Sequence, residues 1–189
     1  MAGDSSGYVP GSNEHGFTLW FTGLSGAGKT TISKLIESEL RQRRQRLEIL
    51  DGDVIRENLS KGLGFSKEDR DTNIRRIAFV ADLLSRNGVI AITAAISPYR
   101  ELRDEARELM GDRFVEIHVK ASVTECARRD VKGLYEKAFA GEIKEFTGVS
   151  DPYEEPLDPE LVLDTEAEDP VESAARVLAL VDSRVGAPA

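Results

Sequence analysis

Cysteine and histidine are scarce in this sequence of 189 residues, and long apolar runs are absent. The single cysteine, Cys126, cannot form an internal disulfide, so we interpret it as a core residue in a reducing compartment. The two histidines, His15 and His118, are too few and too far apart for a zinc site, and we interpret both as structural or incidental. No run approaches the roughly 18 apolar residues of a membrane span, and the polar segment 1–16 lacks a signal-peptide core. We therefore expect a cytoplasmic protein with no membrane partner.

An excess of positive charge is also lacking. The chain carries 34 acidic and 25 basic residues, which gives a formal net charge of −9. Binding to nucleic acid requires a basic face that neutralises phosphates. The arginines within residues 41–46 come at the end of an expected helix, where cations interact favourably with the helix dipole. We therefore expect no nucleic-acid partner.

What the sequence does contain is an alternation of apolar runs with segments of helical periodicity. The expected strands are residues 17–22, 47–50, 89–94, 114–119 and 161–163. The expected helices are residues 29–44, 54–59, 67–86, 99–110, 123–129 and 171–184. This alternation is typical of a parallel sheet covered by helices on both faces. It predicts a single α/β domain over residues 16–184, with three α/β/α layers and a five-stranded parallel sheet, between a flexible polar leader (1–15) and a tail (185–189).

Between the last two expected strands the periodicity is lost. Residues 130–158 are rich in Lys, Glu, Gly and Pro, and this stretch is too long for a passive connection in a compact domain. Long segments of this kind next to a binding site often close over it. We therefore predict a lid over about residues 130–158.

A phosphate-binding motif follows the first expected strand. The sequence GLSGAGKT at residues 23–30 fits the P-loop pattern G-x-x-x-x-G-K-[ST]. Its glycines allow backbone N–H groups to surround a β-phosphate, Lys29 can reach the β- and γ-oxygens, and the Thr30 hydroxyl can bind Mg²⁺. The helix that starts near Lys29 adds the positive end of its dipole. The predicted ATP-binding residues are Gly23, Leu24, Ser25, Gly26, Ala27, Gly28, Lys29, Thr30 and Thr31.

Two carboxylates follow the second expected strand. The guanine-reading N-K-x-D pattern is absent, and no Asp ends the strand at 89–94, so another carboxylate must serve a phosphoryl transfer. Asp51 and Asp53 lie at the carboxyl end of a strand, where ligands bind in open α/β sheets. We predict that Asp53 accepts the proton of an attacking hydroxyl and contacts Mg²⁺, directly or through water. The alternative is that Asp53 only caps a helix starting at Val54. Arg56, one turn further, suits an anionic acceptor.

Five segments in this order resemble the adenylylsulfate (APS) kinase family. They are GLSGAGKTT (23–31), LDGDVIR (50–56), LGFSKEDRDTNIRR (63–76), ISPYR (96–100) and KGLYEKAFAGEIKEF (132–146). The similarity extends from about Gly16 to Arg184. It implies transfer of the γ-phosphoryl group of ATP to the 3′-hydroxyl of adenosine 5′-phosphosulfate (APS), which gives 3′-phosphoadenosine 5′-phosphosulfate (PAPS), with ATP and Mg²⁺ bound.

The resemblance also implies an acceptor site. Its APS contacts fall on Asp53, Arg56, Phe65, Arg70, Asn73, Ile96, Ser97, Lys132 and Phe146. Phe65 and Phe146 would sandwich the adenine, while Arg56, Arg70 and Asn73 would hold the phosphosulfate. From the residues alone, Phe65 is equally well a hydrophobic staple and Phe146 an anchor for the lid. Arg70 and Asn73 alone would be interpreted as an exposed helix face.

Ser97 is the remaining catalytic candidate beside Lys29, Asp51 and Asp53. The matching serine is regarded as a phosphoserine intermediate in some bacterial relatives. Nothing adjacent to Ser97 in the sequence resembles the activating base that a nucleophilic serine requires. We therefore favour direct in-line transfer with Ser97 as a substrate contact, and the covalent role is the minority hypothesis.

Two other functions fit the P-loop itself. One is a kinase of a different small metabolite, and the other is a non-enzymatic nucleotide sensor. By analogy with relatives, we expect a homodimer. Because the same domain occurs fused to sulfate adenylyltransferase, we also expect a functional association with that enzyme.

Overall fold

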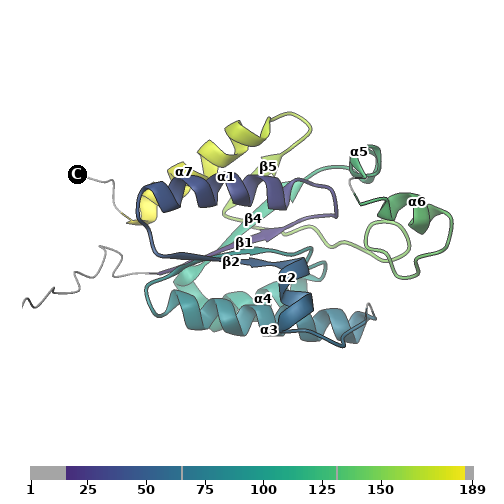
Figure 1. The fold of residues 1–189 in the computed structure, drawn as a ribbon, viewed down its shortest axis with the longest axis horizontal. Coiled ribbons are helices and arrows are strands. Elements are labelled where there is room, and N and C mark those ends of the chain that lie inside the picture. The colour runs from purple at the N-terminus through teal and green to yellow at the C-terminus, as the bar shows by residue number, and fades with distance from the viewer. Residues whose placement is uncertain (1–15, 65, 131, 186–189) are drawn as a thin grey trace, which may run out of the picture.

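The computed structural model describes residues 16–64, 66–130 and 132–185, which form three α/β/α layers (Figure 1). Five parallel strands make one sheet in the order β2-β3-β1-β4-β5. The strands are β1 (Thr18–Thr22), β2 (Leu47–Asp51), β3 (Ile90–Ala94), β4 (Phe114–Lys120) and β5 (Leu161–Asp164). The helices are α1 (Lys29–Gln42), α2 (Gly52–Asn58), α3 (Lys67–Ser85), α4 (Arg100–Met110), the 3₁₀ helix η1 (Gly111–Arg113), α5 (Val123–Arg129), α6 (Leu134–Phe139) and α7 (Pro170–Val185). The predicted fold class is confirmed.

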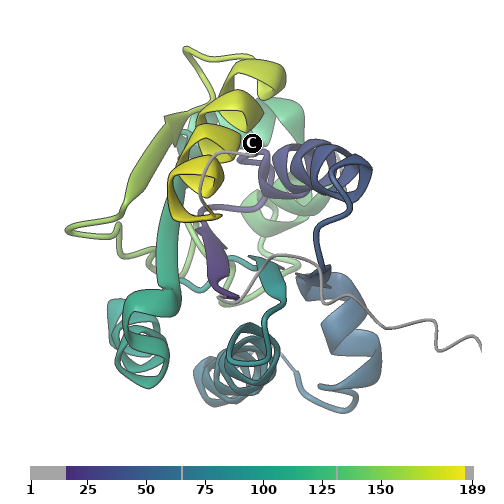
Figure 2. The same ribbon diagram turned by 90° about the vertical axis from the view of Figure 1, so that its left-hand side faces the viewer.

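The sheet separates two hydrophobic cores. Helices α1 and α7 cover one face, and α3 and α4 cover the other (Figures 1 and 2). Because side chains alternate along a strand, Leu19 and Phe21 of β1 enter the first core, which also holds Val177 of α7. Trp20, between them, enters the second core with Ile77 of α3. The apolar runs that predicted the strands are therefore apolar because both faces of the sheet are buried.

Cys126 and His118 have the structural roles that the sequence indicated. Cys126 is a buried member of the first core. His118 is buried on β4, its ring stacks 5.9 Å from that of Tyr153, and burial lowers its pKa. His15 lies outside the described residues. In the part of the chain that the structure describes, no three His, Cys, Asp or Glu side chains are grouped as metal ligands. No helix in the same part has the length and apolarity needed to cross a membrane.

The strand order places a ligand crevice at one edge of the sheet. In the sheet, β3 and β2 lie on one side of β1, and β4 and β5 lie on the other; the chain passes from β1 to the edge strand β2 before it returns to β3. In open α/β sheets, ligands bind beyond the carboxyl ends of the strands where this order reverses. The carboxyl end of β1 is such a position, and the segment that follows it is residues 23–28.

The structure differs from the prediction mainly at element boundaries. Helix α2 begins at Gly52 instead of residue 54, because the carboxylate of Asp51 accepts a hydrogen bond from the backbone N–H of Asp53 (3.0 Å) and so caps the helix. Helix α6 (Leu134–Phe139) was not predicted. It lies in the segment 130–158, which we call the arm and which projects beyond the sheet (Figure 1). The interpretation of the arm as a lid stays a prediction, as do the domain boundaries.

Candidate functional site

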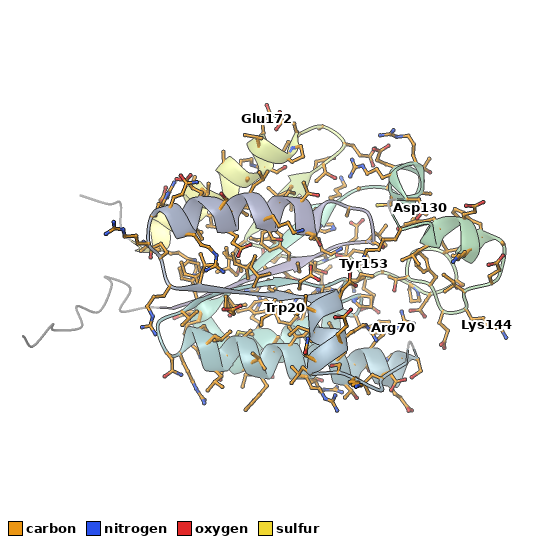
Figure 3. The ribbon with its side chains drawn as sticks, viewed as in Figure 1. Trp20, Arg70, Asp130, Lys144, Tyr153 and Glu172 are labelled. Atoms are coloured by element: carbon orange, nitrogen blue, oxygen red, sulfur yellow. The ribbon has the colours of Figure 1, made fainter. Side chains whose placement is uncertain are left out.

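A cavity of about 800 Å³ opens at the carboxyl ends of β1, β2 and β3. Its walls come from the segment after β1, the start of α2, the start of α3, the segment after β3, and the arm. The predicted site residues that line it are Ser25, Gly26, Gly28, Lys29, Thr30, Thr31, Asp51, Asp53, Arg56, Arg70, Asn73, Ile96, Ser97, Lys132 and Phe146. Figure 3 shows Arg70 on α3 beside the arm, whose tip carries Lys144. Residues from five separate parts of the chain thus meet around one cavity.

The P-loop has the backbone that its glycines allow. Gly23, Gly26 and Gly28 have φ angles of 148°, 78° and 111°. A Cβ on Gly23 would lie 2.3 Å from the carbonyl oxygen of Val119 on β4, so no larger residue fits there. Leu24 and Ala27 are buried in the first hydrophobic core, so they anchor the loop to the protein interior. The loop ends at Lys29, the first residue of α1, so the helix N-terminus faces the cavity.

Lys29 is held inside the loop. Its Nζ donates hydrogen bonds to the carbonyl oxygens of Gly23 (2.8 Å) and Leu24 (2.7 Å). Burial lowers the pKa of Lys29 from 10.5 to about 8, although Asp51 and Asp53 act in the opposite direction. A buried cation whose ammonium contacts only carbonyl oxygens is well suited to meet an added phosphate.

The lowered pKa of Lys29 predicts a pH dependence of stability. Between pH 8 and 10.5 the unfolded chain binds the lysine proton more strongly than the folded chain, so the free energy of unfolding rises with pH in this window. From pH 7.5 to 9.5 we expect a gain of about 2 kcal/mol in the parent protein that Lys29→Met lacks. Urea unfolding at both pH values measures it. Lys34→Met, which removes an exposed lysine of the same helix, serves as the control, and parallel slopes for parent and Lys29→Met would contradict the prediction.

Asp51 and Asp53 lie on opposite sides of the start of α2. Asp51 Oδ2 accepts a hydrogen bond from the Thr30 hydroxyl (3.3 Å), while Asp51 Oδ1 caps the helix. Asp53 therefore does not cap the helix, and the alternative that its role is capping alone is wrong. Its carboxylate is 70% exposed and accepts a hydrogen bond from Lys132 Nζ of the arm (2.5 Å). A carboxylate and a hydroxyl thus meet at the P-loop, and a second carboxylate beside them does not cap the helix and pairs with Lys132 of the arm.

Arg70 and Asn73 are buried, contrary to what a helix surface alone would suggest. Arg70 Nη1 donates to Thr147 Oγ1 (2.9 Å) and lies 2.8 Å from Asp151 Oδ2. Its Nε and Nη2 are buried and have no hydrogen-bond partner among the described residues, and the same holds for Asn73 Oδ1. Arg56, across the cavity, donates to the carbonyl oxygen of Gly64 (2.9 Å). Burial and the charge of Arg70 lower the pKa of Arg56. Two guanidinium groups that repel one another form a site for an anion.

Ser97 is more enclosed than expected. Its backbone has a φ of 41°, in the left-handed region, and the residue is 1% exposed. Its Oγ accepts a hydrogen bond from Trp20 Nε1 (3.1 Å), and its carbonyl oxygen accepts one from Arg103 Nη1 (2.6 Å). The preceding carbonyl, of Ile96, accepts a hydrogen bond from the Thr22 hydroxyl (2.7 Å). The segment after β3 is therefore fixed from the sheet and from α4.

Phe146 and Lys132 extend into the site from the arm. The Phe146 ring packs edge-on against Tyr135 at 5.0 Å, and the Tyr135 hydroxyl donates to the carbonyl oxygen of Ser25 in the P-loop (2.9 Å). The predicted partner of Phe146 in the adenine sandwich, Phe65, lies outside the described residues. The contact of Tyr135 was missed because a short helix in a polar segment gives no clear periodicity. Also missed were Asp130, which caps α6, and the residues that hold Arg70 and Ser97, namely Thr147, Asp151 and Arg103.

Comparison with known proteins agrees with this geometry. The family model of adenylylsulphate kinase matches residues 15–164. The adenylyl-sulfate kinase of Picosynechococcus sp. is 62% identical over 166 residues, which cover 87% of this chain and 93% of that protein. The structure of the Mycobacterium tuberculosis APS kinase CysC in complex with AMPPNP and APS has a TM-score of 0.85 and 42% identity, covering 89% of this chain and 98% of that chain. A probable bifunctional SAT/APS kinase of Sorangium cellulosum is 58% identical over 88% of this chain, but over only 29% of its own length.

The parallel sheet, the P-loop and the cavity with two carboxylates define a P-loop phosphotransferase. The chain belongs to the adenylylsulphate kinase family. It is an enzyme that uses ATP to phosphorylate the 3′-hydroxyl of APS, with PAPS as the product. The resemblance inferred from the five sequence segments is therefore confirmed, and the two alternative functions are not favoured.

Proposed function

We propose that phosphoryl transfer is direct and in-line, with the two nucleotides bound in opposite halves of the one cavity. The P-loop and Lys29 hold the β- and γ-phosphates of ATP, and the start of α2 carries Asp53 toward the acceptor. The 3′-oxygen of APS attacks the γ-phosphorus, the bond from that phosphorus to the β–γ bridging oxygen breaks, and the hydroxyl proton passes to Asp53. The observation that carries this proposal is that Lys29, Asp53 and the unpaired edge of Arg70 all border the same cavity.

The acceptor half combines stacking with charge. Arg70 uses Nη1 for protein contacts, which leaves Nε and Nη2 on one edge of the guanidinium for two oxygens of an anion. Arg56, Arg70 and Asn73 thus suit the phosphosulfate of APS, and Phe146 suits its adenine. Ile96, Ser97 and Lys132 complete the proposed set of APS contacts, and Phe65 remains a proposed contact by resemblance.

The oxygen ligands at the P-loop fit a magnesium ion. Kinase sites hold Mg²⁺ through one or two protein oxygens together with substrate phosphates, and here the Thr30 hydroxyl and the Asp51 carboxylate lie 3.3 Å apart. Thr30 would bind the ion directly, and Asp51 and Asp53 would hold its waters. When bound, the ion would neutralise charge on the β- and γ-oxygens. Lys29 provides the same kind of compensation from the loop side.

A single-step mechanism predicts that the Ser97 hydroxyl is dispensable for chemistry. Its Oγ is buried against the Trp20 indole N–H, and among the described residues no basic side chain donates to it or accepts from it. Ser97→Ala should lower kcat by about tenfold or less, the worth of one hydrogen bond, and should lower thermal stability because Trp20 Nε1 loses its partner. Steady-state ADP formation with APS measures kcat. Incubation with γ-labelled ATP and no APS should leave the protein unlabelled, and a labelled Ser97 with turnover abolished in Ser97→Ala would overturn direct transfer.

The assembly and location of the protein are also proposals. A relative that joins an APS kinase region to SAT in one chain supports a functional association with sulfate adenylyltransferase. A homodimer and a cytoplasmic location follow only by analogy with relatives and by composition. Size-exclusion chromatography with light scattering tests the dimer.

A further inference from the structure

Arg70 is a buried cation of the cavity, and its hydrogen-bond partners come from the arm. Its guanidinium is 10% exposed. Nη1 donates to Thr147 Oγ1 at 2.9 Å and pairs with Asp151 Oδ2 at 2.8 Å, while the Nε–Nη2 edge is buried and unpaired within the described residues. Asp151 and Thr147 therefore occupy one side of the guanidinium and leave the side-on edge, the one that binds two oxygens at once, toward the cavity.

Asp151 is itself held in place. Its Oδ2 accepts a hydrogen bond from the Tyr99 hydroxyl at 2.8 Å, from the segment that leads into α4. The Tyr99 pKa is raised to about 12, by burial and by this bond, so the hydroxyl stays a donor at neutral pH. The carboxylate is thus shared between one cation and one neutral donor. Its position is fixed by two elements of the fold, α3 and the start of α4.

Asp151 lies in a compact turn of the arm, residues 146–151. The carbonyl oxygen of Phe146 accepts hydrogen bonds from the backbone N–H groups of residues 149, 150 and 151, and Phe146 N donates to Ser150 Oγ (2.9 Å). The turn also packs on the P-loop, because a Cβ on Gly148 would meet Leu24 Cδ2 at 2.8 Å. One turn therefore carries Phe146, binds Arg70 through Thr147 and Asp151, and packs against the P-loop.

We propose that Asp151, together with Thr147, is a positioning residue that orients the Arg70 guanidinium to bind the anionic group of the acceptor. Because Asp151 and Phe146 lie in the same turn, the orientation of Arg70 is linked to the position of the Phe146 ring. This inference rests on the proposed function, in which Arg70 binds the phosphosulfate. Asp151 touches neither nucleotide. It acts by fixing the guanidinium in the rotamer that presents Nε and Nη2 together. The turn then sets the distance between the Phe146 ring, which binds adenine, and the Nε–Nη2 edge of Arg70, which binds the anion. This distance makes Phe146 and Arg70 together select a nucleotide of the length of APS.

Two effects of removing the Asp151 charge oppose one another. The carboxylate repels the anion of APS, so its loss would favour binding through charge. Its loss also leaves a nine-tenths buried guanidinium with a single neutral partner, free to leave the bidentate geometry. The loss of orientation is the larger effect, because bidentate contact is lost when the guanidinium rotates. The repulsion is the smaller effect, because Asp151 lies on the Nη1 side of Arg70 and shares its Oδ2 with Tyr99.

A double-mutant cycle with Arg70 tests the proposal. Asp151→Asn should raise KM for APS about tenfold, while kcat and KM for ATP change by about threefold or less. In the background of Arg70→Met, which itself raises KM for APS, the same Asp151→Asn change should alter KM for APS by about twofold or less. A structural role alone would not give this split between the two substrates, nor would its effect vanish when Arg70 is absent. Glu105→Gln, which removes an exposed carboxylate paired with Arg75 of α3, is the matched control.

The outcomes separate the two proposals. If Arg70→Met raises KM for APS but Asp151→Asn does not, or if the two changes act independently, only the positioning role is overturned. If Arg70→Met leaves KM for APS unchanged, the proposed anion site is overturned, and the positioning role with it. Should Asp151→Asn give too little folded protein, Thr147→Val removes the other partner of Nη1 at similar volume, and an unchanged KM for APS in that variant would overturn the proposal.

Discussion

Replacing Asp53 with asparagine is expected to lower kcat for APS phosphorylation by about 10³-fold, within the range that general acid–base catalysis provides. Asparagine keeps the size of the side chain but cannot take the 3′-hydroxyl proton. The carboxylate is 70% exposed and does not cap α2, so the fold should be unaffected. KM for ATP should change little, because the P-loop and Lys29 carry that binding. APS-dependent ADP formation measures both constants.

Glu57→Gln provides the control for Asp53→Asn. Glu57 is an exposed carboxylate of the same helix, and it does not line the cavity. The variant should have parental kcat and stability. If Asp53→Asn retained full turnover, Asp53 would have no role as the proton acceptor, and Asp51 would be the remaining carboxylate at this edge. If Asp53→Asn raised KM for ATP and left kcat unchanged, Asp53 would act in the ATP-binding half of the cavity.

Local sequence predicts those parts of the fold that depend only on interactions between neighbouring residues. Apolar runs indicated the five strands, because the central strands β1 and β3 are buried along their whole length and are mainly apolar. The P-loop motif could be identified from sequence, since it consists of eight consecutive residues. The start of α2 was placed two residues late because both Asp51 and Asp53 are good N-cap residues, and only the geometry shows that Asp51 accepts the hydrogen bond.

Contacts between distant segments could not be predicted in the same way. Arg70 and Asn73 have the positions of an exposed helix face, yet both are buried. The partners of Arg70, which are Thr147 and Asp151, come from the arm, far along the chain. Arg103, three residues into an amphipathic helix, likewise gives no local sign that it is 1% exposed. Buried charged groups need partners, and the partners of Arg70, as well as Glu154 beside Arg103, come from the distant arm. The family resemblance supplied the predicted substrate contacts but not Thr147, Asp151 or Arg103, which hold Arg70 and Ser97 in the structure.

Arg103 is the most deeply buried charged residue in the described part of the protein, with 1% of its surface exposed. Its Nε donates to Glu116 Oε1 on β4 (2.7 Å), Nη1 to the carbonyl oxygen of Ser97 (2.6 Å) and Nη2 to that of Glu154 (2.6 Å). One guanidinium therefore joins α4, the central sheet, the segment after β3 and the base of the arm. Glu116 is buried as well, and its second partner, Arg107, lies at 3.3 Å.

Arg103→Met is therefore expected to destabilise the protein by about 3–5 kcal/mol, because the buried Glu116 carboxylate loses its closer cation and keeps only the contact with Arg107 at 3.3 Å. The carbonyl oxygens of Ser97 and Glu154 also each lose a charged donor. For a chain of this size, the melting temperature should fall by about 10 °C or more. Arg75→Met, which breaks the exposed pair with Glu105, should cost about 1 kcal/mol or less and is the matched control. Chemical unfolding of the parent and of both variants measures the two losses in the free energy of unfolding.

The same substitution has a functional consequence, because Ser97 has a left-handed backbone that Arg103 holds through its carbonyl oxygen. Such strain persists only where the surroundings impose it. In Arg103→Met at a temperature where the variant is folded, we expect the segment after β3 to relax and KM for APS to rise, while KM for ATP stays close to parental. The further change Glu116→Gln should recover part of the stability, since it removes a buried carboxylate that has lost its closer cation, but it should not restore the KM for APS. Recovery of both together would show that Arg103 acts on the site only through global stability.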